Sequence, residues 1–193
     1  MRLFVAVELE PGVVQEVAAC GEELRRRSAR APRARITWVP ADRLHVTVRF
    51  IGEVDEARSR AIVEALQPNL PLTPFESTIE GVGTFPERGA PRVLWAGVGR
   101  GAEALGAVEA DVSARLDRCG VPREPRPYHP HVTLARVREP GGVRTATWLE
   151  GVTGRRFGVS PVNAITLFES RPSPQGHLYV PVQRTPLGGV RPR

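Results

Sequence analysis

Apolar positions along the chain alternate between a two-residue period and a helical period, and this alternation predicts the order of the elements. Residues 3–8 are apolar and β-branched, which favours a strand. After Pro11 the apolar positions recur at helical spacing, through an arginine run that ends before Pro32. Two further strands are expected at 36–39 and 44–51. The N-terminal part therefore predicts a strand, a helix and a strand pair.

The same patterns continue toward the C-terminus, where Asp55 is expected to cap a helix that ends before Pro68. The later expected elements are strands at 75–84 and 92–98, a helix with Leu105, Val108, Val112 and Leu116 on one stripe, a strand from His131, a short helix at 145–149, and strands near 155–160, 162–169 and 177–183. This order predicts an α+β fold in one domain over 1–185, with a loose tail at 186–193.

Two of the expected strands carry the same tetrapeptide pattern, HVTV at 45–48 and HVTL at 131–134. Successive side chains of a strand point to opposite faces, so each histidine shares a face with its threonine. One such strand could be an ordinary polar face, but the repetition in a chain with only 4 histidines favours a chemical role. The repeat indicates a degenerate internal duplication, with two lobes facing each other across a cleft.

The residue types in this repeat suit acid and base catalysis. Histidine titrates near neutrality, so one copy can act as a base and the other as an acid. A hydroxyl beside each imidazole can donate to an oxygen that gains charge in the transition state, which suits in-line displacement at phosphorus. The tetrapeptides contain no carboxylate, and the sequence has neither a Gly-x-Ser-x-Gly elbow nor a Gly-rich phosphate loop. We therefore expect no metal and no cofactor.

Composition adds a basic surface. The net charge of +6 comes from arginine alone, because the chain has no lysine. The arginine fork matches phosphate oxygens, but a coding bias would explain the same composition, so the charge alone leaves a polyanionic partner open. The 2 cysteines, Cys20 and Cys119, fall in expected helices, which suits a reducing compartment. The N-terminal apolar stretch is too short for a signal or a span, so we expect a cytoplasmic protein without membrane association.

The paired tetrapeptides resemble the hallmark of the 2H phosphoesterases. Their flanks narrow the resemblance to the RNA 2′,3′-cyclic phosphodiesterase branch, also called 2′-5′ RNA ligase or LigT-like. The similar stretches span nearly the whole chain: RLFVA at 2–6, LHVTVRFIGEV at 44–54, PRVLWAGV at 91–98, YHPHVTLAR at 128–136 and LFESRPSP at 167–174.

This resemblance implies a bilobal α+β fold, with two pseudo-twofold-related lobes of antiparallel sheet, helices outside and a central groove. It implies hydrolysis of the terminal 2′,3′-cyclic phosphate of RNA to a 2′-phosphomonoester without metal or nucleotide, and we expect a monomer. By the same resemblance His45 would be the proton donor and His131 the proton acceptor. Thr47, Thr133 and Arg136 would bind the phosphate, although strict alternation turns Arg136 away from His131 unless a bulge intervenes.

Other residues near the motifs could also contact the RNA. Tyr128, in the loop before the second motif, is the best candidate to stack on a base, whereas Phe50 and Trp95 are expected in the core. His129, next to Pro130, is expected outside the strand. The remaining expectations are a surface position for His177 and an extended phosphate-binding groove that includes Arg123, Arg126 and Arg138.

Three alternatives stay open at this point. Reverse ligation that joins 2′-5′ ends is expected only as a side activity, because water is so abundant. The chain could instead be a non-catalytic RNA-binding module whose histidines grip phosphate. It could also apply the same two-histidine chemistry to small cyclic nucleotides or to 2′-5′ oligonucleotides, because the motifs specify only the phosphate.

Overall fold

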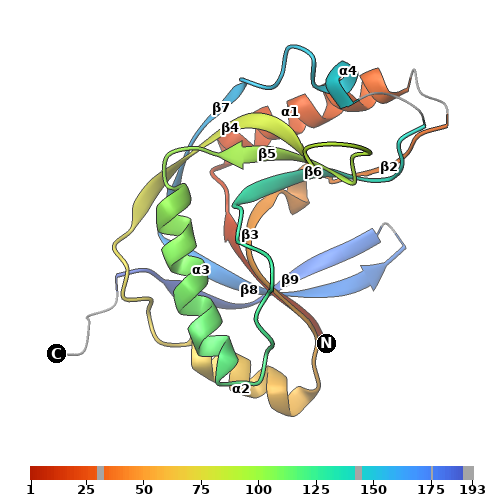
Figure 1. The fold of residues 1–193 in the computed structure, drawn as a ribbon. Coiled ribbons are helices and arrows are strands. Elements are labelled where there is room, and N and C mark those ends of the chain that lie inside the picture. The colour runs from red at the N-terminus through yellow and green to blue at the C-terminus, as the bar shows by residue number, and fades with distance from the viewer. Residues whose placement is uncertain (30–32, 142–144, 175, 189–193) are drawn as a thin grey trace.

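Nine antiparallel strands form one curled sheet in the computed structural model, which describes residues 1–29, 33–141, 145–174 and 176–188 (Figure 1). The order across the sheet is β7-β4-β5-β6-β3-β1-β8-β9, and β2 pairs with the later part of β6. The strands are β1 (Arg2–Glu8), β2 (Arg35–Trp38), β3 (His45–Glu53), β4 (Phe75–Phe85), β5 (Val93–Val98), β6 (His131–Glu139), β7 (Arg156–Val162), β8 (Ala164–Ser173) and β9 (Gly176–Pro186).

Helices interrupt the strands at the expected places. They are α1 (Pro11–Ser28), a 3₁₀ turn at Ala41–Arg43, α2 (Glu56–Leu66), α3 (Ala102–Asp117) and α4 (Thr145–Leu149). Local chemistry explains their ends: Pro11 opens α1, and the Asp55 side chain accepts a hydrogen bond from the Arg58 amide at 2.8 Å. Gly120 adopts a φ of +72° just after α3, a conformation that glycine reaches without strain. The α+β fold class is confirmed.

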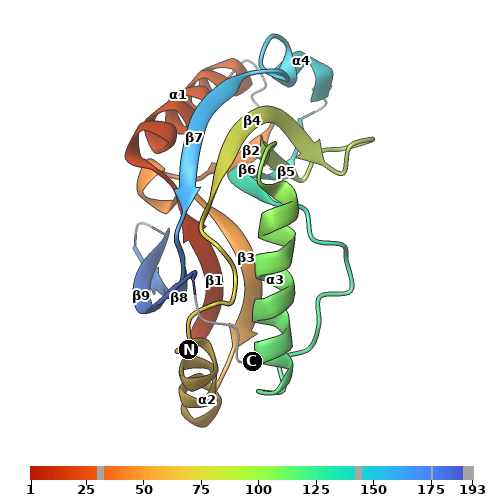
Figure 2. The same cartoon turned by 90° about the vertical axis from the view of Figure 1, so that its left-hand side faces the viewer.

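The expected two lobes are two halves of this one sheet. We call β7, β4, β5, β6 and β2 the β6 half, and β3, β1, β8 and β9 the β3 half. Each long helix packs on the half opposite to the strand that precedes it in the chain. Helix α1 follows β1 but packs on β7 and β6, and α3 follows β5 but packs on β3 (Figures 1 and 2). Because each helix crosses over, the opposite face of each half is left open near the strands that carry the tetrapeptides.

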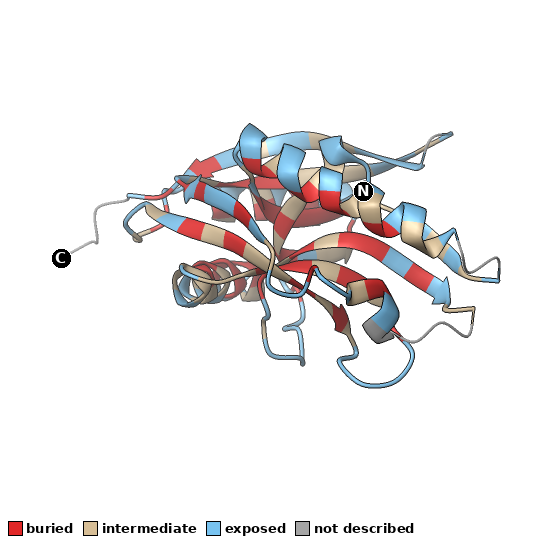
Figure 3. Cartoon of the chain, turned by 90° about the horizontal axis from the view of Figure 1, so that it is seen from above, coloured by how far each residue is buried: buried red, intermediate tan, exposed pale blue. Residues whose placement is uncertain are grey.

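Burial follows the predicted stripes. The four apolar residues expected to mark α3, Leu105, Val108, Val112 and Leu116, are fully buried. They belong to a core that also takes in the inward faces of both halves, and buried positions alternate with exposed ones along helices and strands (Figure 3). Burial of this kind contributes most of the favourable free energy of folding.

The chain end corrects one expectation. The tail was expected to be loose from Pro186, but β9 runs through that residue. Leu187 is buried, forms a bridge with Leu70, and donates its amide to the carbonyl of Asn163 at 2.8 Å. Residues 186–188 therefore belong to the folded part, because an apolar side chain next to the core is withdrawn from water. Residues 189–193 lie outside the described residues.

Candidate active site

The two tetrapeptides lie side by side in the middle of the sheet. The described register between β3 and β6 pairs Val46 with Val132, and both valines are buried. In an antiparallel ladder this pairing brings His45 level with Thr133, and Thr47 level with His131. The structure therefore brings the four predicted residues together on one open face, with each histidine near the other motif's threonine.

A backbone carbonyl orients each imidazole in the same way. The Nδ1 atom of His45 lies 2.8 Å from the carbonyl oxygen of Arg43, and that of His131 lies 2.7 Å from the carbonyl oxygen of His129. A carbonyl can only accept, so Nδ1 carries the proton in both rings. The Nε2 atom of each neutral ring is then unprotonated and can take or, once charged, give a proton.

Local packing holds both rings in place. Nε2 of His45 lies 3.0 Å from Oγ1 of Thr47, and its ring packs against Phe4, with centroids 5.1 Å apart. The ring of His131 meets Phe85 edge to face at 5.1 Å. Both imidazoles are thus fixed by a hydrogen bond and by an aromatic neighbour, which favours a preorganised acid and base pair.

Burial lowers the pKa of both histidines below the ordinary imidazole value, because desolvation disfavours the charged ring. The backbone carbonyl that accepts from each Nδ1 acts in the opposite direction. The positive charge of Arg136 lowers both pKa values further, and His131 also lowers the pKa of His45. Both rings are therefore mainly neutral at neutral pH, and a bound anion would raise their pKa values.

Each motif strand contains a β-bulge directly after its threonine. Val5 and Ala6 of β1 are neighbours but pair with Arg49 and Thr47, so Val48 is the extra residue of β3. The register of β5 with β6 skips one residue in the same way: Leu94 pairs with Ala135 and Trp95 with Thr133, so Leu134 is the extra residue of β6. An extra residue shifts the alternation of every later side chain by one position.

The bulges decide which later residues reach the open face. Leu134 and Ala135 are both buried, and Arg136 is then exposed on the same face as His131 and Thr133. This is the condition under which Arg136 was expected to reach the phosphate. On β3 the same shift buries Arg49 at 4% exposure and turns Phe50 outward.

A cavity of about 640 Å³, which we call the motif cavity, opens over this face. It is lined from both halves of the sheet. Its walls include His45, Thr47, Phe50, Thr133, Arg136 and Tyr179. A site that combines apolar rings with a few convergent polar groups is the ordinary form of a small-ligand pocket.

Comparison with known proteins decides the family. A family model described as the 2′-5′ RNA ligase superfamily matches residues 13–159. The chain belongs to the 2′-5′ RNA ligase superfamily. The resemblance drawn from the paired tetrapeptides is thereby confirmed.

Two curated relatives of this superfamily member resemble it over nearly their whole length. A curated RNA 2′,3′-cyclic phosphodiesterase of Archaeoglobus fulgidus is 32% identical over 179 residues, which cover 93% of this chain and 96% of the relative. The same name is given to a Thermus thermophilus relative that is 31% identical, with coverage of 100% and 93%.

Solved structures agree with the sequence matches. A crystal structure from Thermus thermophilus superposes with a TM-score of 0.76 at 28% identity and covers 99% of this chain and 100% of that one. Escherichia coli LigT complexed with 3′-AMP gives a TM-score of 0.70 at 27% identity, with coverage of 96% and 97%. The curled antiparallel sheet is thus shared with these structures.

Of two aromatic assignments in this 2′-5′ RNA ligase superfamily chain, that of Tyr128 stays a prediction and that of Phe50 was wrong. Tyr128, expected to stack on a base, packs against the core and donates its phenol O–H to the carbonyl of Thr47 at 3.0 Å. Burial raises the pKa of that phenol, as desolvation disfavours the phenolate. Phe50, expected in the core, is 58% exposed and lines the motif cavity. The error at Phe50 arises from the bulge in β3, which strand alternation does not reveal.

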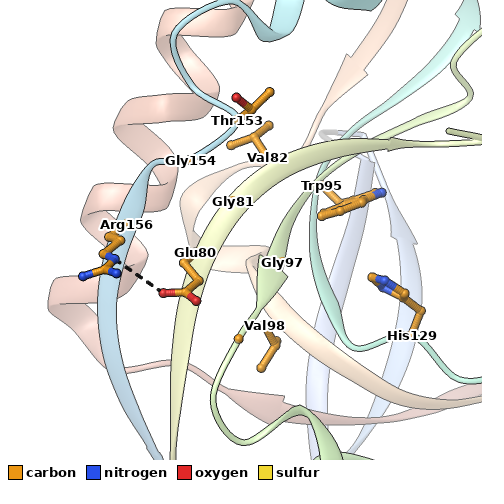
Figure 4. A pocket seen from close by; sticks show the side chains of 11 residues that line it. Glu80, Gly81, Val82, Trp95, Gly97, Val98, His129, Thr153, Gly154 and Arg156 are labelled. Atoms are coloured by element: carbon orange, nitrogen blue, oxygen red, sulfur yellow. Dashed lines mark ion pairs between the residues drawn. The ribbon is translucent and has the colours of Figure 1, made fainter.

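The remaining expectations are met in part. Trp95, expected in the core, is only partly buried and lines a second cavity (Figure 4), whereas His129 precedes β6 as expected. His177 is exposed, but it also lines the motif cavity, where its Nδ1 lies 3.0 Å from the hydroxyl of Ser170. Sequence reasoning gave it no role because it stands in a different hairpin from both motifs.

The basic residues near the site divide into two groups. Arg138 lines the motif cavity together with Arg2 and Arg43, which sequence reasoning did not single out. Arg123 instead donates its Nε–H to the carboxylate of Asp117 at 2.6 Å, just after α3. The arginine-rich composition therefore contributes to the cavity through residues of β1, β6 and the 3₁₀ turn before β3.

Within the described residues, no three His, Cys, Asp or Glu side chains are grouped so that they could hold a metal ion. In the same part of the chain, no helix is both long and apolar enough to cross a membrane. Both cysteines are free thiols.

Proposed function

We propose that this chain hydrolyses the terminal 2′,3′-cyclic phosphate of RNA to a 2′-phosphomonoester without a metal ion. One observation carries the proposal: two imidazoles, each with Nδ1 held by a carbonyl, present Nε2 on one open face where their strands meet. Relatives that are named RNA 2′,3′-cyclic phosphodiesterases support the substrate class.

The proposed reaction is a displacement at phosphorus. His131 takes a proton from water through Nε2, and the water oxygen forms a new bond to phosphorus. The bond from phosphorus to the 3′ oxygen breaks, and His45 gives that oxygen its proton. The assignment of donor and acceptor follows the family resemblance, because the two rings are oriented alike. Proton transfer of this kind contributes about 10² to 10⁴ in rate.

Negative charge develops on the non-bridging phosphate oxygens in the transition state, and hydrogen-bond donors are needed to stabilise it. Thr47 and Thr133 lie level with the opposite histidines and can donate hydroxyl hydrogen bonds from both sides. Arg136, on the same face, offers a positively charged fork that matches two phosphate oxygens. Their positions support a phosphate held between the two motif strands.

The test uses an RNA oligonucleotide that ends in a 2′,3′-cyclic phosphate, incubated with purified protein in the presence of EDTA. We expect a 2′-phosphate product, identified against authentic 2′- and 3′-phosphate standards. His45→Ala and His131→Ala should each lower turnover by at least about 10². Arg60→Ala, on the exposed face of α2, is the control variant. Full turnover in either histidine variant would contradict the proposal.

The open alternatives make different predictions in the same assay. A binding module would retain RNA without forming product, with an affinity that falls steeply as salt rises. An enzyme for small cyclic nucleotides or 2′-5′ oligonucleotides would turn those over faster than the RNA end. A monomeric state and a cytoplasmic location remain predictions.

A further inference from the structure

The described residues that lead into the second motif, 121–130, contain no helix or strand. They run from the end of α3 back to the start of β6, and we call them the lead-in segment (Figures 1 and 2). The carbonyl of His129, near the end of this segment, accepts the hydrogen bond that fixes Nδ1 of His131. The orientation of His131 therefore depends on what holds the lead-in segment in place.

Side chains of β3 hold this segment. Residues 122–129 form no backbone-to-backbone hydrogen bond with the rest of the described chain. Instead, the guanidinium of Arg49 donates to the carbonyl of Pro122, and the phenol of Tyr128 donates to the carbonyl of Thr47 at 3.0 Å. Because Arg49 and Thr47 both belong to β3, the first motif strand holds both ends of the segment that orients the histidine of the second motif.

Arg49 is buried with incomplete partners. Its side chain is 4% exposed, its Nη1 atom lies 3.9 Å from Oε1 of Glu109 on α3, and its Nε atom is buried with no hydrogen-bond partner among the described residues. A buried charge that is only partly paired is costly, and replacement of a buried ion pair by apolar side chains is often neutral or stabilising. Stability alone therefore does not explain an arginine at this position.

Glu109 connects Arg49 to the other end of the lead-in segment. Its carboxylate accepts a hydrogen bond from the hydroxyl of Ser113. Burial, and after it the negative charge of Glu109, raises the pKa of the Tyr128 phenol, so this carboxylate acts on the group that donates to Thr47. Arg49, Glu109 and Tyr128 thus form one cluster on the side of β3 that α3 covers.

We propose that Arg49 is a positioning residue, which holds the lead-in segment so that the carbonyl of His129 meets Nδ1 of His131 and leaves Nε2 of that ring unprotonated. The proposal rests on the role of His131 in the function proposed above. The hydrogen bond at one ring nitrogen decides which nitrogen carries the proton, so a misplaced carbonyl would release the ring from the tautomer that can act as a base. The bulge at Val48 then has two effects, because it turns Phe50 to the motif cavity and Arg49 to the lead-in segment.

The first measurement reads the tautomer directly and needs no substrate. Nitrogen-15 NMR of the histidine rings at pH 8 shows which ring nitrogen carries the proton. In the wild-type chain we expect Nδ1–H at both His45 and His131. Arg49→Met, which keeps a long unbranched apolar side chain, should move His131 toward the Nε2–H tautomer. His45 should keep Nδ1–H, because its acceptor is the carbonyl of Arg43, and it serves as the reference within the same molecule.

The second measurement is hydrolysis of the RNA end by the same variant. Arg49→Met should lower kcat by about 10- to 100-fold, as small misplacements of a catalytic group do. KM should change little, because Arg49 is not among the residues that line the motif cavity. Burial lowers the pKa of His131, the carbonyl of His129 raises it, and the charges of His129 and Arg136 lower it. Loss of the carbonyl bond should therefore move the acid limb of kcat/KM to lower pH.

A second buried arginine supplies the matched control. Arg115 on α3 is 9% exposed, pairs with Asp111, and donates to the carbonyl of Asn69 at 3.0 Å, so it too holds a loop by a backbone carbonyl. Arg115→Met should lower stability but leave the tautomer of His131 and kcat unchanged. Arg49→Lys should recover part of the lost turnover, because an ammonium can still donate to one carbonyl.

The outcomes separate this proposal from the function on which it rests. If Arg49→Met does not fold, the double variant Arg49→Met with Glu109→Gln, which also removes the carboxylate left without its partner, takes its place. If His131 keeps Nδ1–H in the folded variant, or if Arg115→Met lowers kcat as much as Arg49→Met, Arg49 is only a structural residue and the proposal is wrong. If the wild-type chain hydrolyses no RNA end, the proposed function fails, whereas the tautomer still shows whether Arg49 positions His131.

Discussion

The phenol of Tyr128 donates a hydrogen bond to the backbone carbonyl of Thr47, 3.0 Å away. This bond joins the loop that leads into the second motif to the strand that carries the first. The two motif strands otherwise meet, in the described register, at the pair of Val46 with Val132. Tyr128 therefore helps to set the distance between the two halves of the site.

Removing this phenol should loosen the site. Tyr128→Phe deletes one partly buried hydrogen bond, so we expect a loss of about 1 kcal/mol in the free energy of unfolding. We also expect turnover to fall more than it would from that change alone, because the motifs would be held less firmly. Urea denaturation and steady-state kinetics check both effects. Tyr179→Phe, which removes the phenol that lines the motif cavity, is the comparison variant and should change the free energy of unfolding little.

The pH dependence of kcat/KM should be bell-shaped and centred on the acid side of neutrality. The base must be neutral and the acid charged, and burial lowers the pKa of both rings below the ordinary value of about 6.5. Activity should therefore rise as pH increases through the pKa of His131 and fall as pH increases through the pKa of His45. Measurement from pH 4.5 to 9 tests this, and a maximum well above pH 7 would contradict it.

The same pKa shifts make stability depend on pH. The folded pKa of each ring is lower than its unfolded value, so the unfolded chain binds more protons in this range. The contribution of the two neutral rings to the free energy of unfolding is fully present above about pH 6.5. It should be lost as pH falls from there toward the folded pKa values. A double variant, His45→Asn with His131→Asn, should show a shallower loss between pH 7 and 5. Unfolding measured at pH 8, where both rings are neutral, supplies the reference.

Arg136 should matter more for turnover than its exposed position suggests. Arg136→Ala removes a charge-assisted donor from the face that carries His131 and Thr133, and we expect kcat/KM to fall about tenfold or more. Arg136→Lys should recover only part of this loss, because an ammonium cannot donate in a bidentate way. Arg138→Ala, two residues further along β6, is the matched variant. An equal loss in both variants would indicate general attraction rather than a specific contact.

The secondary-structure elements and a candidate acid and base could be predicted from the sequence. The strand and helix periods are local properties, so the apolar stripe of α3 and the cap at Asp55 could be read directly. The repeated His-x-Thr pattern predicts His45 and His131 as the acid and base without any structure, because a strand places alternate residues on one face.

The surroundings of those two histidines depend on contacts between residues that are distant in the chain. The bulges at Val48 and Leu134 depend on how neighbouring strands pair, and they alone turn Phe50 and Arg136 to the open face. Likewise, a flat indole at Trp95 needs a glycine on the adjacent strand β4, which no local pattern reports. Up to the first bulge of a strand, local alternation determines the face of the sheet to which each side chain points. Beyond the bulge, that face depends on pairing with residues that are distant in the chain.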